Sequence, residues 1–429
     1  MHKDFEIHFD DLSKMEGHAS LDIIVKGGEV KEVKLKISES KRFFTQAIKG
    51  KPALSVHQLV SRICGTCSIA HLTCCIEALE YALAIQPSEQ TTKLRELSMI
   101  GTILRDHAMH LYLFCLPDLL NKDSVLDFDE SEKHWIEDAF QVKKAGNDLA
   151  TVIAGRAVHA LYPQIGGFSS IPSKEQVDEL IKELRSSRDA ILGIIDLFYN
   201  SPLVFENKTD CIALVNKDFS FVTGEIKFSN GDIVPEDEFA DHLHRVIIPY
   251  SQATGFKCET RVYRVGALAR LNLNKSSLSK ETKKDASKAL STFPSNDIFD
   301  NELAQAIEML HCVDHAIKLF ESSDFKEEIP PRITATKGVG VGVIEAPRGT
   351  LYYELSVDDQ GLIKEGNLVI PTAQNQVTME CDISIFVQKC LQENKSKEEI
   401  EHGIETLIRA YDPCMSCATH FLKVNWKES

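Results

Sequence analysis

The amino-acid sequence predicts an α+β protein with a mostly helical core of long helices and β-hairpins at its periphery. Three observations predict this class. Apolar and polar residues alternate on both sides of a glycine pair near the start of the chain, and again in residues 338–371. The segment 88–116 has helical spacing instead. Two later segments open with the capping signature of a helix.

The first 40 residues form the predicted N-terminal β-hairpin region. Residues 21–25 and 30–37 carry apolar side chains at about every second position, with Gly27-Gly28 between them. Glycines supply the positive φ angles that a two-residue hairpin turn requires. We therefore expect two antiparallel strands joined at this turn.

Helical patterns dominate the next part of the chain. Cys67 and His71 are four positions apart and would lie on one face of a helix that starts there. Asp106 and His110 repeat this spacing in the following long segment. Capping boxes, with serine three positions before glutamine or glutamate, open two more predicted helices at residues 173–176 and 396–399.

Residues 338–371 return to strand-like alternation, with a turn predicted at 358–361. The run of alternating glycines at 338–342 superficially matches a nucleotide-binding loop. Strand-like residues follow it where a helix N-terminus would be required, and no acidic residue stands in a βαβ context. We therefore reject a nucleotide loop and assign any nicotinamide, flavin or deazaflavin site to partner proteins.

Composition narrows the classes of function. The 429 residues carry a formal net charge of −16, with no basic run, which disfavours nucleic acid and anionic membrane surfaces as partners. No stretch approaches the ~18 apolar residues of a transmembrane helix, and Met1 to Glu6 do not begin a signal peptide. We expect a cytoplasmic protein without a transmembrane segment.

Two CxxC pairs are the strongest functional signal. Cys64 and Cys67 lie near the start of the chain, whereas Cys414 and Cys417 lie at its end. Four thiolates in two such pairs predict a metal site. Closing a loop of about 350 residues costs roughly 5 kcal/mol, so only a large folded core can bring the pairs together. We therefore expect one domain over residues 1–429 and leave open whether the metal is zinc, nickel or iron.

The other eight cysteines are scattered and are predicted to be small buried apolar residues. They provide no second CxxC set for an iron–sulfur cluster, so electrons from a redox reaction would leave through another polypeptide. These cysteines are Cys74, Cys75, Cys115, Cys211, Cys258, Cys312, Cys381 and Cys390.

The residues around the CxxC pairs carry a family resemblance. Arg62-Ile63 precedes the first pair and His71 follows it, while Asp412-Pro413 precedes the second pair and His420 follows it. Together these motifs resemble the catalytic large subunit of [NiFe]-hydrogenases, most closely the soluble multimeric group linked to NAD(P), deazaflavin or heterodisulfide systems. The resemblance runs over essentially the whole chain. It implies the large-subunit fold and the reaction H₂ ⇌ 2H⁺ + 2e⁻.

The resemblance also implies the ligands of the metal centre. Cys64 and Cys414 would bind nickel terminally, and Cys67 and Cys417 would bridge nickel to an iron that carries CO and cyanide. A closed structural zinc site is the alternative interpretation of the same four residues.

Catalytic residues follow from the same resemblance. Glu16 would carry protons away from the metals, because heterolytic cleavage needs a titratable group nearby. The family usually has arginine two positions earlier, where this chain has Lys14. Arg348 would hang over the open face of the metals, with Asp106 and Asp412 as the carboxylates that orient it.

Further residues would surround the iron. Pro347 belongs to the segment that carries Arg348, and Pro371 and Thr372 resemble a strand whose hydroxyl and amides hydrogen-bond the cyanides. His71 would donate to the iron ligands or the thiolates. Arg156 and His159 also match the family, and we expect a structural role for them.

One family element differs. Arg42-Phe43-Phe44-Thr45 lacks the glutamate that related chains use to bind a second ion, Mg²⁺ or Fe²⁺, beside the C-terminal histidine, here His420. Glu39 or water would have to replace it. Residues 421–429 resemble the tail that an endopeptidase removes after nickel insertion, so the mature chain is expected to end at His420.

The implied partners are a small subunit with a [4Fe–4S] cluster, further diaphorase or electron-transfer subunits, maturation proteins and the endopeptidase. Two alternatives from other classes share the fold. A hydrogen-sensing regulatory protein has the same metals and negligible turnover. A scaffold subunit like that of respiratory complex I lacks the four cysteines, which disfavours it here.

Overall fold

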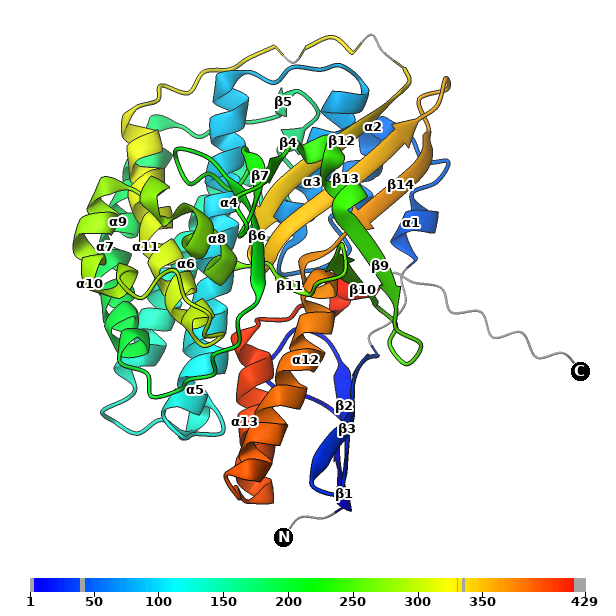
Figure 1. Ribbon diagram of the computed structural model, residues 1–429. Coiled ribbons are helices and arrows are strands. Elements are labelled where there is room, and N and C mark those ends of the chain that lie inside the picture. The colour runs from blue at the N-terminus through cyan, green and yellow to red at the C-terminus, as the bar shows by residue number, and fades with distance from the viewer. Residues whose placement is uncertain (1–3, 39–42, 330, 334–335, 420–429) are drawn as a thin grey trace, which may run out of the picture.

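Four long helices form one side of the molecule, and the computed structural model describes them within residues 4–38, 43–329, 331–333 and 336–419 (Figure 1). These helices are α4 (Glu89–Ala108), α6 (His134–Ala154), α7 (Lys174–Tyr199) and α11 (Asp300–Glu321), and they pack against one another. Gly101 on α4 and Gly146 on α6 allow close packing, because a Cβ on Gly146 would lie 2.6 Å from the backbone nitrogen of Arg105.

The predicted helix over 88–116 is interrupted. After α4 the chain forms a π-helical segment, Met109–Cys115, and then the short α5 (Leu116–Leu119). Pro117 offers no backbone N–H and its ring crowds the preceding turn, which accounts for the wider turn before it. His110 therefore lies in a π-helical turn, and an α-helical wheel would misplace it relative to Asp106.

The N-terminal sheet contains the predicted hairpin. Strands β2 (Ala19–Lys26) and β3 (Glu29–Ile37) pair antiparallel around Gly27-Gly28, which confirms the prediction. A further strand, β1 (Asp4–Phe9), pairs with β2 and lies outside the predicted hairpin. The sheet leans on α12 (Pro371–Gln392) and α13 (Lys397–Ala410).

Both predicted capping boxes are present. Ser173 caps α7 with Gln176, and Ser396 caps α13 with Glu399. No helix in the described ranges is long and apolar enough to cross a bilayer.

A three-stranded sheet lies beside α3 (Ser68–Ala82). Its strands β12 (Gly338–Ala346), β13 (Gly349–Val357) and β14 (Ile363–Val369) confirm the strands predicted for this region. The alternating glycines of β12 face α3, so the helix backbone approaches the strand directly. The glycine run therefore serves helix–sheet packing.

Gly340→Ala is expected to destabilise the protein by about 3 kcal/mol, at the upper end of overpacking costs. A Cβ at this position would lie 2.1 Å from the carbonyl oxygen of Ala78 and 2.2 Å from the nitrogen of Ala82, and backbone atoms cannot rotate away. Urea unfolding followed by circular dichroism measures the loss. Gly167→Ala is the matched control, since a Cβ there meets nothing within 4 Å. Equal stability of the two variants would contradict the packing argument.

The remaining elements complete the connections between these layers. The helices are α1 (Phe44–Ala47), α2 (Ala53–Val60), α8 (Ala267–Asn274), α9 (Lys280–Asp285), α10 (Ser287–Leu290) and α14 (Met415–Ala418), with 3₁₀ turns at Val125–Asp127, Glu236–His242 and Lys275–Ser277. The strands are β4 (Pro163–Gln164), β5 (Gly167–Phe168), β6 (Asp210–Val215), β7 (Glu225–Phe228), β8 (Ile233–Val234), β9 (Leu243–Ile247), β10 (Thr254–Cys258) and β11 (Tyr263–Arg264).

Candidate metal centre

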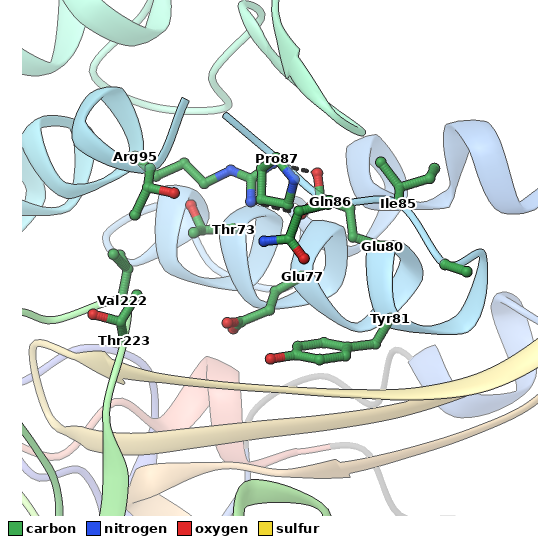
Figure 2. A pocket seen from close by; sticks show the side chains of 12 residues that line it. Thr73, Glu77, Glu80, Tyr81, Ile85, Gln86, Pro87, Arg95, Val222 and Thr223 are labelled. Carbon is green, nitrogen blue, oxygen red and sulfur yellow. Dashed lines mark hydrogen bonds and ion pairs between the residues drawn. The ribbon is translucent and has the colours of Figure 1, made fainter. Parts of the chain in front are cut away.

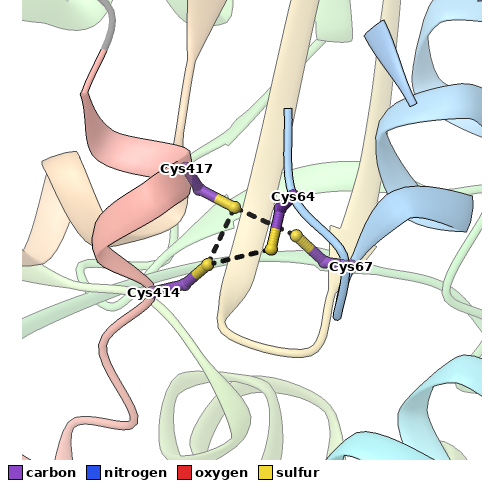
Figure 3. Close-up of side chains that lie close together, drawn as sticks. All are labelled: Cys64, Cys67, Cys414 and Cys417. Atoms are coloured by element: carbon purple, nitrogen blue, oxygen red, sulfur yellow. Dashed lines mark hydrogen bonds between the residues drawn. The ribbon is translucent and has the colours of Figure 1, made fainter. Parts of the chain in front are cut away.

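The two CxxC pairs meet in the interior of the protein (Figure 3). Cys67 immediately precedes α3, and Cys414 immediately precedes α14, so each pair lies at the start of a helix. The Sγ atoms of Cys64 and Cys414 are 3.4 Å apart, and those of Cys67 and Cys417 are 3.0 Å apart. All four sulfurs lie within 4.8 Å of one another.

The four sulfurs suit a metal centre and not a pair of disulfides. All four cysteines are free and buried, and their separations far exceed the ~2.05 Å of an S–S bond. Burial raises the pKa of the Cys417 thiol well above its ordinary value. Four neighbouring buried thiols can therefore ionise together only when a cation lies between them. Soft sulfur donors of this kind bind zinc, nickel or iron.

Glu16 lies against the second pair. Its backbone forms a parallel bridge with Cys414, and its carbonyl accepts a hydrogen bond from the nitrogen of Met415 at 2.9 Å. Its carboxylate accepts from the Cys414 Sγ at 3.0 Å and from the Ser416 nitrogen at 3.0 Å. Burial, followed by the neighbouring Cys64, raises the pKa of this carboxyl. A proton can thus be held directly beside a thiolate.

Arg348 is fixed on the other side by the two predicted carboxylates. Its Nη1 donates to Asp106, its Nη2 donates to Asp412 Oδ1 at 2.9 Å, and its Nε donates to the Asp412 carbonyl at 3.0 Å. All three residues are buried. Burial disfavours the charged guanidinium, but the two carboxylates more than offset this and hold the Arg348 pKa well above its ordinary value.

A small cavity lies between Arg348 and the sulfurs, with Pro347, Pro371 and Thr372 in its wall. Pro371 and Thr372 do not continue a strand, which corrects the prediction. Strand β14 ends at Val369, and Pro371 is the first residue of α12, where its missing N–H and fixed φ are tolerated. The Thr372 hydroxyl accepts from the Cys414 nitrogen at 2.9 Å, so its own proton remains available.

His71 lies one helical turn after Cys67. Its Nε2 is 3.4 Å from the Cys417 Sγ, and its Nδ1 is 2.8 Å from the hydroxyl of Tyr353. Tyr353 on β13 therefore orients the imidazole toward the sulfur.

Sequence reasoning missed three residues around this centre: Arg105, Gln305 and Tyr353. Arg105 is buried and donates to the carbonyls of Thr66, inside the first CxxC pair, and Ala157. Gln305 on α11 donates to Asp412 Oδ2 at 2.9 Å. Only the position of Arg105 directly before Asp106 could have drawn attention to it, because the others come from distant elements.

The remaining predicted residues lie elsewhere. His420, Glu39 and Arg42 fall outside the described residues, so the second-ion site has no structural description. Lys14 pairs with Asp118. His159 contacts the Ser61 carbonyl through Nδ1 at 3.0 Å, beside the first CxxC pair.

Two of the scattered cysteines are less buried than predicted. Cys381 is exposed and Cys258 is partly exposed, whereas the other six are buried. Cys381 lies on the solvent-facing side of α12, and the residue type by itself could not reveal this.

A buried cluster of four cysteines, flanked by a carboxyl group and a guanidinium, defines a thiolate-ligated metalloenzyme. Comparison with known proteins specifies its family. The profile of the nickel-dependent hydrogenases matches residues 42–154 and 242–420. The chain therefore belongs to the nickel-dependent hydrogenase family, and it is the large, catalytic subunit of a [NiFe]-hydrogenase.

Individual relatives agree with this assignment. The chain is 32% identical over 426 residues to the alpha chain of sulfhydrogenase 1 from Pyrococcus furiosus, covering 97% of this chain and 98% of the relative. It is 26% identical over 448 residues to an F420-non-reducing hydrogenase of Methanothermobacter thermautotrophicus, covering 95% and 93%. An NAD⁺-reducing [NiFe]-hydrogenase in the H₂-reduced state superposes with a TM-score of 0.86 at 26% identity, covering 97% and 99%. These findings favour the hydrogenase over the sensor, scaffold and zinc alternatives.

Proposed function

We propose that this chain cleaves H₂ reversibly and heterolytically at a nickel–iron centre held by the four cysteines. The observation that carries the proposal is the placement of four unbonded buried sulfurs between Glu16 and Arg348. When bound, the metals would supply the Lewis-acidic, redox-active site at which H₂ is split. The side chains of this chain bind the metals, receive the proton and exclude water.

Cys64 and Cys414 act as terminal nickel ligands, and Cys67 and Cys417 bridge to iron. The small cavity supports this division, because Cys67 and Cys417 line it and Cys64 is absent from its described wall. Its other walls are largely apolar, which suits an iron that carries CO and cyanide. The proton of the Thr372 hydroxyl and the guanidinium of Arg348 are the donors available for cyanide nitrogens.

Glu16 receives the proton released by cleavage. Its carboxylate already accepts a hydrogen bond from Cys414, so a proton on that sulfur has a direct path to a carboxyl oxygen. Arg348 keeps its charge beside the centre, where it polarises H₂ or holds a bound anion, while Asp106 and Asp412 keep it in place.

Electrons leave through a small subunit that carries a [4Fe–4S] cluster, with diaphorase or other electron-transfer subunits beyond it. Two findings support this. The cysteine quartet is the one potential metal-binding group found in the described residues. The names of the relatives designate them as single subunits, one of them as an iron-sulfur subunit, so relatives work in assemblies.

Maturation completes the proposal. Maturation proteins insert the metals, an endopeptidase then removes residues 421–429, and His420 binds a Mg²⁺ or Fe²⁺ ion. The chain forms one domain over residues 1–429, since both ends contribute to one site. A cytoplasmic location fits the twelve free cysteines, which a reducing compartment preserves.

Infrared spectroscopy of the anaerobically purified complex tests the function, together with nickel and iron analysis and an H₂-uptake assay. One CO band, two cyanide bands, near-equal nickel and iron at this site, and turnover are expected. The same bands with negligible turnover would favour a hydrogen sensor. Zinc without such bands would make the cysteines structural and overturn the proposal.

A further inference from the structure

Two neighbouring cavities meet at Tyr81, far along α3 from the metal centre. The first has a volume of about 420 Å³ and is lined by α3, the start of α4 and the segment that ends at Thr223 (Figure 2). The second has a volume of about 710 Å³ and begins at Gly224. Tyr81 lines both cavities and is 64% exposed. We call the two cavities together the Tyr81 groove.

The Tyr81 groove is strongly acidic. Seven carboxylates line it, and its one basic side chain, Arg95, is already paired with Glu80. The other six carboxylates have no ion pair within the described parts of the chain, and they include Glu77 and Glu236. Burial and the charge of Glu236 raise the pKa of Glu77, and burial raises that of Glu236 to about 7. The groove therefore lacks a compensating positive charge.

Buried hydrogen-bonding groups in the groove also lack partners. The Thr73 hydroxyl and the Arg95 Nε find no hydrogen-bond partner among the described residues, although Thr73 is 2% and Arg95 6% exposed. Both residues line the first cavity. Unsatisfied buried groups of this kind are costly, so they point to a polar occupant.

The second cavity runs along an open sheet edge. Strand β12 is the edge strand of its sheet, and its outward N–H groups at Val343 and Glu345 bond to the Glu77 carboxylate and the Phe221 carbonyl. Alternation along the strand directs the N–H groups of Val339 and Val341 outward too. Neither has a partner in the part of the chain that the structure describes, and Val339 is 62% exposed.

We propose that the Tyr81 groove binds an extended, basic segment of a partner polypeptide, which adds as a strand along Val339–Val341. Its backbone would pair with the open edge of β12, and its lysine or arginine side chains would reach Glu77 and Glu236 beside Tyr81. The open edge favours a polypeptide over a simple cation, because only a polypeptide satisfies the backbone and the carboxylates together.

The groove and the metal centre are separate sites. Tyr81 follows Cys67 along α3 by about 20 Å at 1.5 Å per residue. The variants below therefore test the groove without touching the metal ligands, and failure of this proposal would leave the hydrogenase function intact.

The test measures binding of a fluorescein-labelled heptapeptide of alternating arginine and valine to the full chain by fluorescence anisotropy. We expect salt-sensitive binding, and no binding of the matched peptide with glutamate in place of arginine. Glu77→Gln with Glu236→Gln should weaken binding by about tenfold or more. The control, Glu137→Gln with Glu398→Gln, changes the net charge equally on exposed helix surfaces and should leave binding unchanged.

A second variant tests the strand addition itself. Val341→Pro removes one outward N–H from an edge strand, a position where proline is tolerated, and should weaken binding, whereas Val341→Thr should not. Hydrogen–deuterium exchange should show slower exchange at Val341 when the arginine peptide is present. Equal binding of both peptides, equal loss in the control variant, or displacement by MgCl₂ at matched ionic strength would each overturn the proposal.

Discussion

Cys417→Ser is expected to remove both the nickel and the hydrogen turnover of the enzyme. Cys417 lies 3.0 Å from Cys67 and 2.9 Å from Cys414, so it is shared between the two halves of the sulfur cluster. A serine hydroxyl does not ionise near neutral pH and is a harder donor than a thiolate. The variant should retain under about a tenth of the wild-type nickel, because metal affinity depends on the deprotonated ligand.

Nickel content by mass spectrometry and H₂ uptake are the two measurements for this variant. Cys381→Ser is the matched control, since it makes the same change at an exposed cysteine outside the cluster. Circular dichroism establishes that both variants are folded. Wild-type nickel in folded Cys417→Ser would remove this residue from the set of metal ligands.

Glu16→Gln is expected to keep the metals and lose turnover by about 10²- to 10⁴-fold, the usual contribution of a positioned acid–base group. The amide preserves the size of the side chain and can still accept the hydrogen bonds from Cys414 and Ser416. It cannot take up a proton at that oxygen, so the released proton has no acceptor beside the sulfur.

Steady-state H₂ oxidation, compared with nickel content and the infrared bands, separates proton transfer from metal loss. Glu6→Gln, on the exposed strand β1, is the control for a glutamate-to-glutamine change. Undiminished turnover with full nickel would exclude Glu16 from the proton path. Loss of nickel would instead indicate that the carboxylate supports the cluster structurally.

The Arg348 ion pairs illustrate how far a resemblance between sequences can reach. The family motif contains an arginine and nearby acids, which predicts Asp106 and Asp412 as its partners, and the structure places both carboxylates on that guanidinium. The reason they meet is not visible in the sequence. It requires α4, the loop before β13 and the segment before α14 to converge.

The Pro371-Thr372 segment shows where local patterns mislead. The preceding residues alternate as a strand, and the sequence offers no clear sign of where the strand ends. Proline is compatible both with a strand end and with the first position of a helix. The long buried face of α12 decided between them, because that face packs against several other elements.

Local chemistry alone specified the hairpin at Gly27-Gly28, the capped starts of α7 and α13, and the four cysteines as a metal site, since turn geometry, capping and thiolate affinity act over a few residues. Tertiary structure decided which distant groups surround those cysteines. It placed Arg105, Gln305 and Tyr353 around the centre, brought Glu16 to Cys414, and left the acidic Tyr81 groove without a counter-charge. The physical reason is that hydrogen bonds and ion pairs act over a few ångströms in space, and only the packing of elements remote in sequence determines which groups come that close.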